Sequence, residues 1–415
     1  MSQETAICKS SLVCGAAMLL AAALPAAAAD PDERRVSIGG FGTIGTLYHD
    51  DDGLEYRRSA SQPRGAESGE VDFATDTIGG VQLNAAWNPQ IEAVVQAVTR
   101  LTAENDWEPQ LTRAFLRYNP NETVAVRLGR LGWEIYPRAD SRDVGYSQLG
   151  IRPAVEIFGI LPTDRFDGGE LALKRPFGKG LFSLKLYGGA AGGKAVNEDG
   201  PVTDFDGSAL WGGHVDYQHG AWVLRLGSGV FELGEPPPLD PLAAGLSMTG
   251  VPQAIGLANE FADNGRKILF YAAGVAYDEG PAQARLFAAH TDSEHLVSPN
   301  LNLGQLIGGY RIGAFTPYAS FAIVRSTEDV RATGLPDAPQ FAALNAGARL
   351  AQESFQYNQH SLALGLRWDF MPKLALKLQV DRVWLRDSRL VLDERPDPYA
   401  DADMTVLGFA LDFVF

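Results

Sequence analysis

Ten of the basic side chains between residues 100 and 185 are the residues of this sequence best placed to do chemistry. Six fall on or beside short predicted strands, where they alternate with apolar residues: Arg100, Arg113, Arg117, Arg127, Lys174 and Lys185. Four lie in one long connecting segment, 132–168: Arg138, Arg142, Arg152 and Arg165. The same segment carries the acids Glu134, Asp140, Asp143, Glu156 and Asp164. Cations facing a segment of mixed charge produce a transverse field that sorts solutes by charge and dipole. We therefore expect that a passage lined by these residues would admit anions with a weak preference over cations.

A purely structural role explains the same residues. The Arg and Asp side chains can pair with one another and hold the segment in place, because partly buried charges need partners. Both roles can hold together, since a paired segment still leaves a rim of charge facing solvent.

Bond-making chemistry has little support in the sequence. A hydrolase needs a placed nucleophile or acid–base group, and neither a Gly-x-Ser-x-Gly elbow nor a paired metal-ligand spacing is present. We keep a hydrolase as the weakest alternative and expect no enzyme. The histidines are scattered singly: His49, His214, His219, His290, His295 and His360.

The segments that carry these residues have the sequence pattern of β-strands. Apolar and polar residues alternate with period two almost everywhere after residue 35, for example over 77–87 and 362–370. Helical periodicity is nearly absent. The pattern predicts an all-β, antiparallel fold.

The connections between the strands alternate strictly between short and long. The short turns lie at 88–89, 119–121, 176–180, 219–220, 278–281, 311–313 and 371–372. The long stretches lie near 49–75, 103–109, 132–168, 191–205, 232–263, 292–299, 327–354 and 388–401. This layout is typical of an outer-membrane β-barrel, with tight periplasmic turns and long extracellular loops. It predicts a transmembrane barrel of about 16 strands, with 18 left open. Arg or Lys facing lipid near the midplane costs about 2–4 kcal/mol, so the register that turns the basic residues inward is favoured.

The chain ends on a strongly alternating strand. Leu407, Phe409, Leu411, Phe413 and Phe415 occupy every second position. This ending resembles the signal through which the barrel-assembly machinery recognises outer-membrane barrels, with Phe415 as the contact. Aromatic residues beside the short turns favour girdles at the bilayer interface: Trp87, Tyr118, Tyr217, Trp222, Tyr277, Tyr310, Tyr318, Trp368 and Phe370.

The first 29 residues have the organisation of a secretory signal peptide, with Lys9, an apolar run and a small-residue end. Its removal would take away both cysteines, Cys8 and Cys14, and leave residues 30–415 as a single barrel domain. A lipid anchor at Cys14 is the weaker alternative, because the apolar run follows that cysteine. The net charge of -16 argues against nucleic-acid binding, which needs a basic footprint.

Acidic residues concentrate in the predicted extracellular loops, as in Asp50-Asp51-Asp52 and Asp393-Glu394. Such loops could hold Ca²⁺ or Mg²⁺ that bridges lipopolysaccharide, although plain solvated loops are the favoured explanation. We expect no other cofactor.

The region around the long segment is similar to a group of Gram-negative porins that are distantly related to the phosphate-selective porins. The resemblance is carried by Arg127-Leu128-Gly129-Arg130, by 141–146, by 152–156 and by Arg165-Phe166-Asp167-Gly168. It implies a homotrimeric, passive channel of the outer membrane in which this third extracellular loop, 132–168, folds into the barrel and constricts it. A channel specific for phosphate, an organic acid or a sugar is the alternative. The basic residues outnumber inward aromatic ones, which favours anions.

Overall fold

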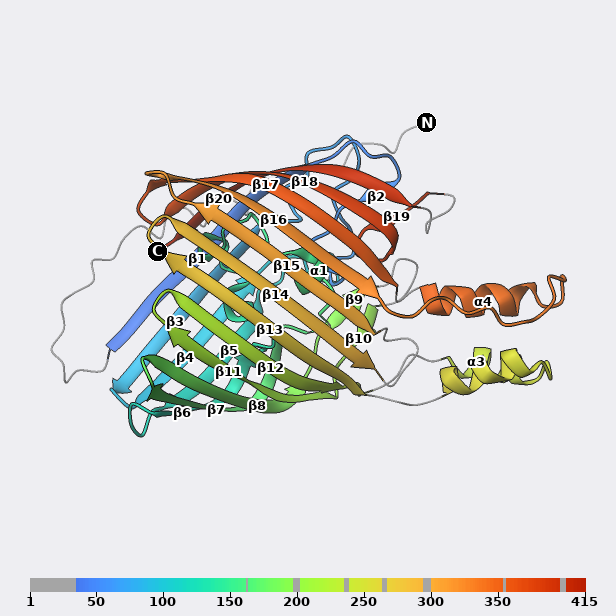
Figure 1. The fold of residues 1–415 in the computed structure, drawn as a ribbon, viewed down its shortest axis with the longest axis horizontal. Coiled ribbons are helices and arrows are strands. Elements are labelled where there is room, and N and C mark those ends of the chain that lie inside the picture. The colour runs from blue at the N-terminus through green and yellow to red at the C-terminus, as the bar shows by residue number, and fades with distance from the viewer. Residues whose placement is uncertain are drawn as a thin grey trace, which may run out of the picture.

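The computed structural model describes residues 35–161, 163–196, 202–234, 239–262, 267–293, 300–353, 356–395 and 401–415. Sixteen antiparallel strands close into one barrel (Figure 1). Its strands are β1 Arg35–Tyr48, β3 Ile78–Asn88, β4 Ile91–Thr99, β5 Gln110–Tyr118, β6 Val124–Gly132, β7 Arg165–Phe177, β8 Gly180–Ala191, β11 Ser208–His219, β12 Trp222–Glu232, β13 Lys267–Glu279, β14 Ala282–Ser293, β15 Leu301–Tyr310, β16 Phe315–Ser326, β17 Tyr357–Met371, β18 Leu374–Ser388 and β20 Ala402–Val414. The predicted fold class and strand number are confirmed.

The last strand closes the barrel on the first. β20 pairs with β1 over Phe41↔Val414 to Tyr48↔Leu407 and with β18 on its other side. The backbone of Phe415 exchanges hydrogen bonds of 3.0 and 3.2 Å with Gly40. Closure leaves no unpaired strand edge, which is what a sheet crossing a bilayer requires.

The outer face of the wall is apolar. Leu226, Leu286 and Leu364 are each more than half exposed on it. The alternate positions of the same strands turn into the barrel, as Lys377 and Asp381 of β18 do. Most of the predicted aromatic girdle residues, such as the exposed Trp222, lie on the outer face. Tyr318 does not: it is 5% exposed and lies on the luminal side, where its hydroxyl donates to Gln379.

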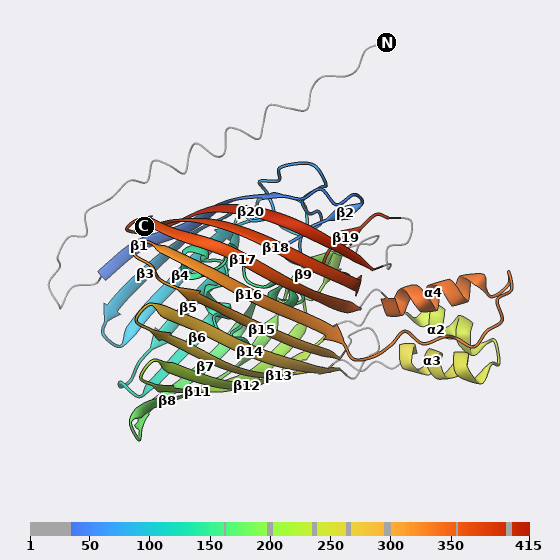
Figure 2. The ribbon, with the colours of Figure 1, turned by 45° about the horizontal axis from the view of Figure 1, so that its top comes forward.

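The connections follow the predicted alternation, but two of them hold more structure than expected. The loops predicted as polar at 232–263 and 327–354 contain helices α2 Asp240–Ser247, α3 Pro252–Ala262 and α4 Ala342–Glu353. These helices pack together beyond the ends of the strands (Figure 2). α2 and α3 of the same loop pack on each other, and residues of the second loop, including Ala348 of α4, complete the shared apolar cluster. None of the helices in the described part of the chain has the length and hydropathy needed to cross a membrane.

The connection between β6 and β7 folds into the barrel. We call residues 133–164 the inner loop; the predicted boundary at 168 was too long, because β7 begins at Arg165. The inner loop contains two short 3-10 turns, Ala139–Ser141 and Gly145–Ser147, and the helical turn α1 Val155–Phe158. Trp133, Ile135, Ile151 and Ile157 are fully buried, so this loop supplies much of the core inside the wall.

The first long loop, 49–77, covers the inner loop at one end of the barrel. Its strand β2 Leu54–Glu55 pairs with β19 Leu392–Asp393 of the last loop. The buried Arg57 donates to the carbonyls of Gln62 and Leu390, both at 3.2 Å. The first and the last long loops, distant in sequence, are therefore joined across the long-loop end. A further small sheet there pairs β9 Lys194–Val196 with β10 Val202–Asp204.

Candidate functional site

Aromatic contacts attach the start of the inner loop to the wall. The ring centroid of Trp133 lies 5.2 Å from that of Phe270 on β13 and 6.0 Å from that of Phe231 on β12. Tyr136 meets Phe287 of β14 edge-on at 4.9 Å. Aromatic pairs at these separations stabilise beyond the area they bury, so the loop is fixed against β12–β14.

A buried ion-pair network holds the middle of the inner loop. The guanidinium of Arg152 lies 2.6 Å from the Asp76 carboxylate and 3.1 Å from that of Asp381 on β18. It also donates to the Tyr56 hydroxyl and lies over that ring, 5.0 Å from the centroid. One side chain thus joins the inner loop, the first loop and the wall.

A second buried cation receives the turn around Gly145. Lys377 donates to the carbonyls of Gly145 and Gly150 at 2.9 and 2.8 Å and forms an ion pair with Asp412, 2.8 Å from Oδ2. Asp412 accepts a hydrogen bond from Thr43 on its other oxygen. A Cβ at Gly145 would lie 2.1 Å from the Asp412 carboxylate, so only glycine allows this approach.

Acids of the inner loop and wall neutralise much of the predicted positive stripe. Arg127 pairs with Glu134 at 3.1 Å and with Glu170. Lys185 reaches Glu134 at 2.5 Å. Burial alone would raise the pKa of Glu134, but Lys185 and Arg127 together lower it to about 2. Arg117 pairs with Glu92 at 3.2 Å. The structural role predicted for these residues therefore applies to several of them.

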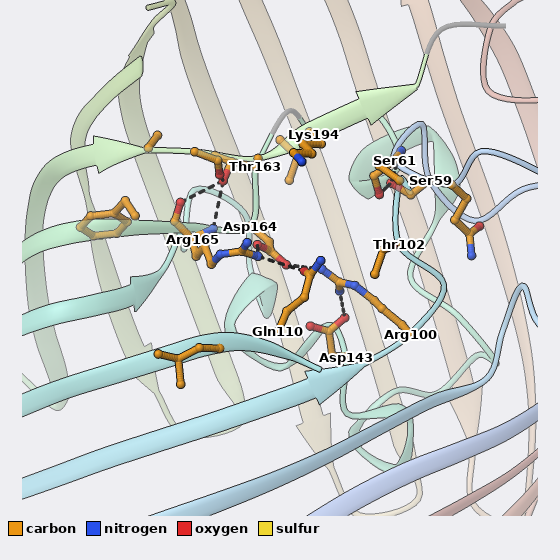
Figure 3. Close-up of a pocket in the computed structure, with 18 of the residues that line it drawn as sticks. Ser59, Ser61, Arg100, Thr102, Gln110, Asp143, Thr163, Asp164, Arg165 and Lys194 are labelled. Carbon is orange, nitrogen blue, oxygen red and sulfur yellow. Dashed lines mark hydrogen bonds and ion pairs between the residues drawn. The ribbon is translucent and has the colours of Figure 1, made fainter. Parts of the chain in front are cut away.

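A cavity of about 760 Å³ opens between the inner loop and the long loops, and we call it the loop-side cavity. Figure 3 shows Arg100 at its centre, between Asp143 and Asp164. Asp164 also approaches Arg142 at 3.5 Å and Arg165 at 3.0 Å. The hydroxyls of Ser59, Ser61 and Thr102 and the ammonium group of Lys194 complete a polar lining.

Charge in this cavity is densely packed. Burial, together with the neighbouring Arg100, Arg113 and Arg58, lowers the pKa of Arg142 to about 9, against the opposing effect of Asp143. Burial raises the pKa of Asp143, but Arg100 and Arg142 outweigh this and leave it below its ordinary value. Arg142 and Asp143 therefore both stay ionised around neutral pH.

The other predicted residues lie elsewhere. Arg113 donates to the backbone carbonyl of Asp140, whose carboxylate takes no part in that contact. Glu156 is buried and accepts a hydrogen bond from Gln359. Lys174 lines a small cavity of about 240 Å³ near the short turns, together with Lys185. Arg138 lines a third cavity, below the inner loop.

Several residues of the lumen were absent from the prediction. Arg58 lines the loop-side cavity, and Arg225 and Arg285 turn inward from β12 and β14. Period-two alternation with the outward Leu224, Leu226 and Leu286 carried the signal for the last two. Nothing local marks Arg58, since it lies in a long loop.

Solved structures of bacterial channels share this architecture. No protein-family model matches the chain, and no curated protein matches it in sequence. The structure is similar to Salmonella typhi OmpF in complex with daunomycin, with a TM-score of 0.56 and 12% identity over 93% of this chain and 99% of that chain. The fold is that of the Gram-negative porins.

Two further structures with the porin fold are similar to a comparable degree. The anion-selective porin from Comamonas acidovorans has a TM-score of 0.52 and 12% identity, covering 92% of this chain and 100% of that chain. The outer membrane channel DcaP of Acinetobacter baumannii has a TM-score of 0.52 and 11% identity, covering 92% and 97%. At this identity the likeness establishes the porin fold alone. The distant relationship to the phosphate-selective porins stays a prediction.

The described residues offer no evident metal centre to this porin fold. No three His, Cys, Asp or Glu side chains gather there closely enough to hold a metal ion. The expected binding of Ca²⁺ or Mg²⁺ with lipopolysaccharide stays a prediction.

Proposed function

We propose that this protein is an outer-membrane channel for the passive diffusion of small hydrophilic solutes, with a weak preference for anions. One observation carries the proposed preference. Five cations of the lumen and its cavities form no ion pair with a carboxylate in the described part of the chain: Arg58, Arg113, Arg138, Lys174 and Arg285. Unpaired cations in a confined passage raise the local concentration of anions.

The preference is tested by reversal potential in a planar bilayer under a salt gradient. Arg113→Ala is expected to shift the potential toward zero and to lower the anion/cation permeability ratio roughly twofold, the size expected of one screened charge among several. Arg117→Ala is expected to shift the potential in the same direction, because its removal leaves the Glu92 carboxylate without its cation.

Arg349→Ala is the matched control, since it removes the same charge from an exposed position on α4. A cation-selective wild type, or an equal shift in the control, would contradict the proposal. A complete absence of conductance would reopen the hydrolase alternative.

We further infer that Phe415 is read by the barrel-assembly machinery and that the assembled protein is a homotrimer in contact with lipopolysaccharide. The Phe415 side chain supports the first inference, because it is 48% exposed on the outer face at the end of β20. The trimer follows from the sequence resemblance and is tested by native mass in detergent.

Phe415→Ser is expected to reduce assembled barrel in the outer membrane several-fold while leaving refolding of the purified chain in detergent unchanged. Heat-modifiable gel mobility measures both quantities. Phe177→Ser, at an exposed short turn, serves as the control. Equal loss in refolding would show that Phe415 acts on stability and not on recognition.

A further inference from the structure

The third cavity, of about 270 Å³, lies under the inner loop on the side of the short turns, and we call it the turn-side cavity. The inner loop forms its roof with Tyr136, Pro137 and Arg138, and β12–β15 form its wall. The loop approaches β13 closely at Gly274, where an added Cβ would lie 3.0 Å from Pro137. Phe158 of α1 lines both this cavity and the loop-side cavity, so the two cavities lie on either side of this residue.

The charges of the turn-side cavity are predominantly positive. Arg138, Arg225 and Arg285 line it, against the single carboxylate of Asp278. Asp278 is already paired with Arg311 at 2.8 Å, and Arg225 with Asp216 at 2.6 Å. Arg138 and Arg285 form no ion pair with any described residue. Arg138 donates from one guanidinium nitrogen to the carbonyl of Ser147. Its remaining N–H groups and the guanidinium of Arg285 are therefore available to an anion.

The backbone of Arg138 is held in an unfavourable conformation. Arg138 has a φ of 64°, a left-handed conformation that is uncommon for a residue with a side chain. Such conformations cluster where the surrounding structure imposes a functional geometry. Burial also lowers the pKa of Arg138, although nearby acids act in the opposite direction.

The rest of the lining is apolar and partly aromatic. Tyr136 and Phe287 meet edge-on, and Tyr136 also contacts Phe158 at 5.9 Å. Leu149, Ile157 and Ile307 continue this surface. A hydrated inorganic anion would gain nothing from such a wall, whereas a flat apolar group would be removed from water.

We propose that the turn-side cavity binds small aromatic carboxylates, with the carboxylate on Arg138 and Arg285 and the ring against the aromatic wall. The inference rests on the proposed channel function and names a solute class for it. An arginine guanidinium can donate two parallel hydrogen bonds to one carboxylate, whereas a lysine ammonium group cannot. The cavity volume lies just below the range of about 300–1,000 Å³ usual for drug-sized ligands, which suits a single-ring solute.

The test uses benzoate and the whole folded barrel. Binding is measured by calorimetric titration in detergent, and block of chloride current is measured separately in a planar bilayer. Benzoate is expected to bind at least about tenfold more tightly than acetate or inorganic phosphate, because only its ring buries apolar area. Arg285→Gln should weaken benzoate binding about tenfold or more, and Arg285→Lys should weaken it less. Arg382→Gln, on the outer face and paired with Asp403, should have no effect.

Equal binding of acetate and benzoate, or benzoate binding that is indifferent to Arg285→Gln, would overturn the proposal. Anion conductance without benzoate binding would overturn it while leaving the proposed channel function intact. Arg285-dependent benzoate binding without conductance would support the site and refute the channel.

Discussion

Arg152→Met is expected to destabilise the barrel by about 3–5 kcal/mol and to release the inner loop, because it leaves buried carboxylates without their cation. The Arg152 side chain is 2% exposed and that of Asp76 is fully buried. Asp381 loses the same partner. The measurements are the denaturant midpoint of the refolded protein and the single-channel conductance, which should rise and become noisier.

Two further variants separate this network from a general effect of losing a charge. Arg130→Met removes an arginine whose partner Asp167 is more than half exposed, and pairs of that kind contribute about 0–1 kcal/mol. Adding Asp76→Asn to Arg152→Met should recover part of the lost stability, since one uncompensated carboxylate disappears. An Arg152→Met protein with the wild-type midpoint and conductance would show that the network does not anchor the loop.

Trp133→Ala is expected to detach the start of the inner loop from β12 and β13. The ring is 1% exposed and packs on Phe231 and Phe270. Removing a buried tryptophan costs about 3–5 kcal/mol, so the loop should sample positions away from the wall. Because the same residue begins the loop that narrows the lumen, ion selectivity should weaken together with stability. Unfolding midpoint and reversal potential are the two readouts.

Trp211→Ala is the matched control, because Trp211 lies on the outer face of β11 and is 42% exposed. It should leave selectivity unchanged. A selectivity loss confined to Trp133→Ala would locate the filter at the inner loop; an equal loss in both variants would locate the effect in general weakening of the wall.

The barrel itself could be predicted from local patterns. In a meander each strand pairs with its sequence neighbours, so period-two alternation and the order of short and long connections determine strand number and topology. The closing pair follows from the alternating residues Leu407 to Phe415, which face outward together. Arg127 and Lys185 could be placed inside on the same ground, because a charge facing lipid is costly.

The pairing of those charges could not be predicted. Arg152 meets Asp76 and Asp381, which are 76 and 229 positions away, and no local pattern indicates which acid a buried cation reaches. Glu134 neutralises Arg127 and Lys185 only because the inner loop crosses the lumen at that height. The proposed selectivity depends on the cations without an ion pair, and these can be identified only when the pairs are known.

The sequence by itself therefore determined the wall of this protein, whereas the tertiary structure decided its lumen. The wall obeys a one-dimensional rule: the period of two separates lipid from interior at every strand. The lumen depends on contacts between loops far apart in the chain, as do the helices α2–α4 and the inward position of Tyr318. The placement of the unpaired Arg138 and Arg285 also depends on the tertiary structure. These residues are 147 positions apart, on a loop and a strand that meet at one cavity only in the closed barrel.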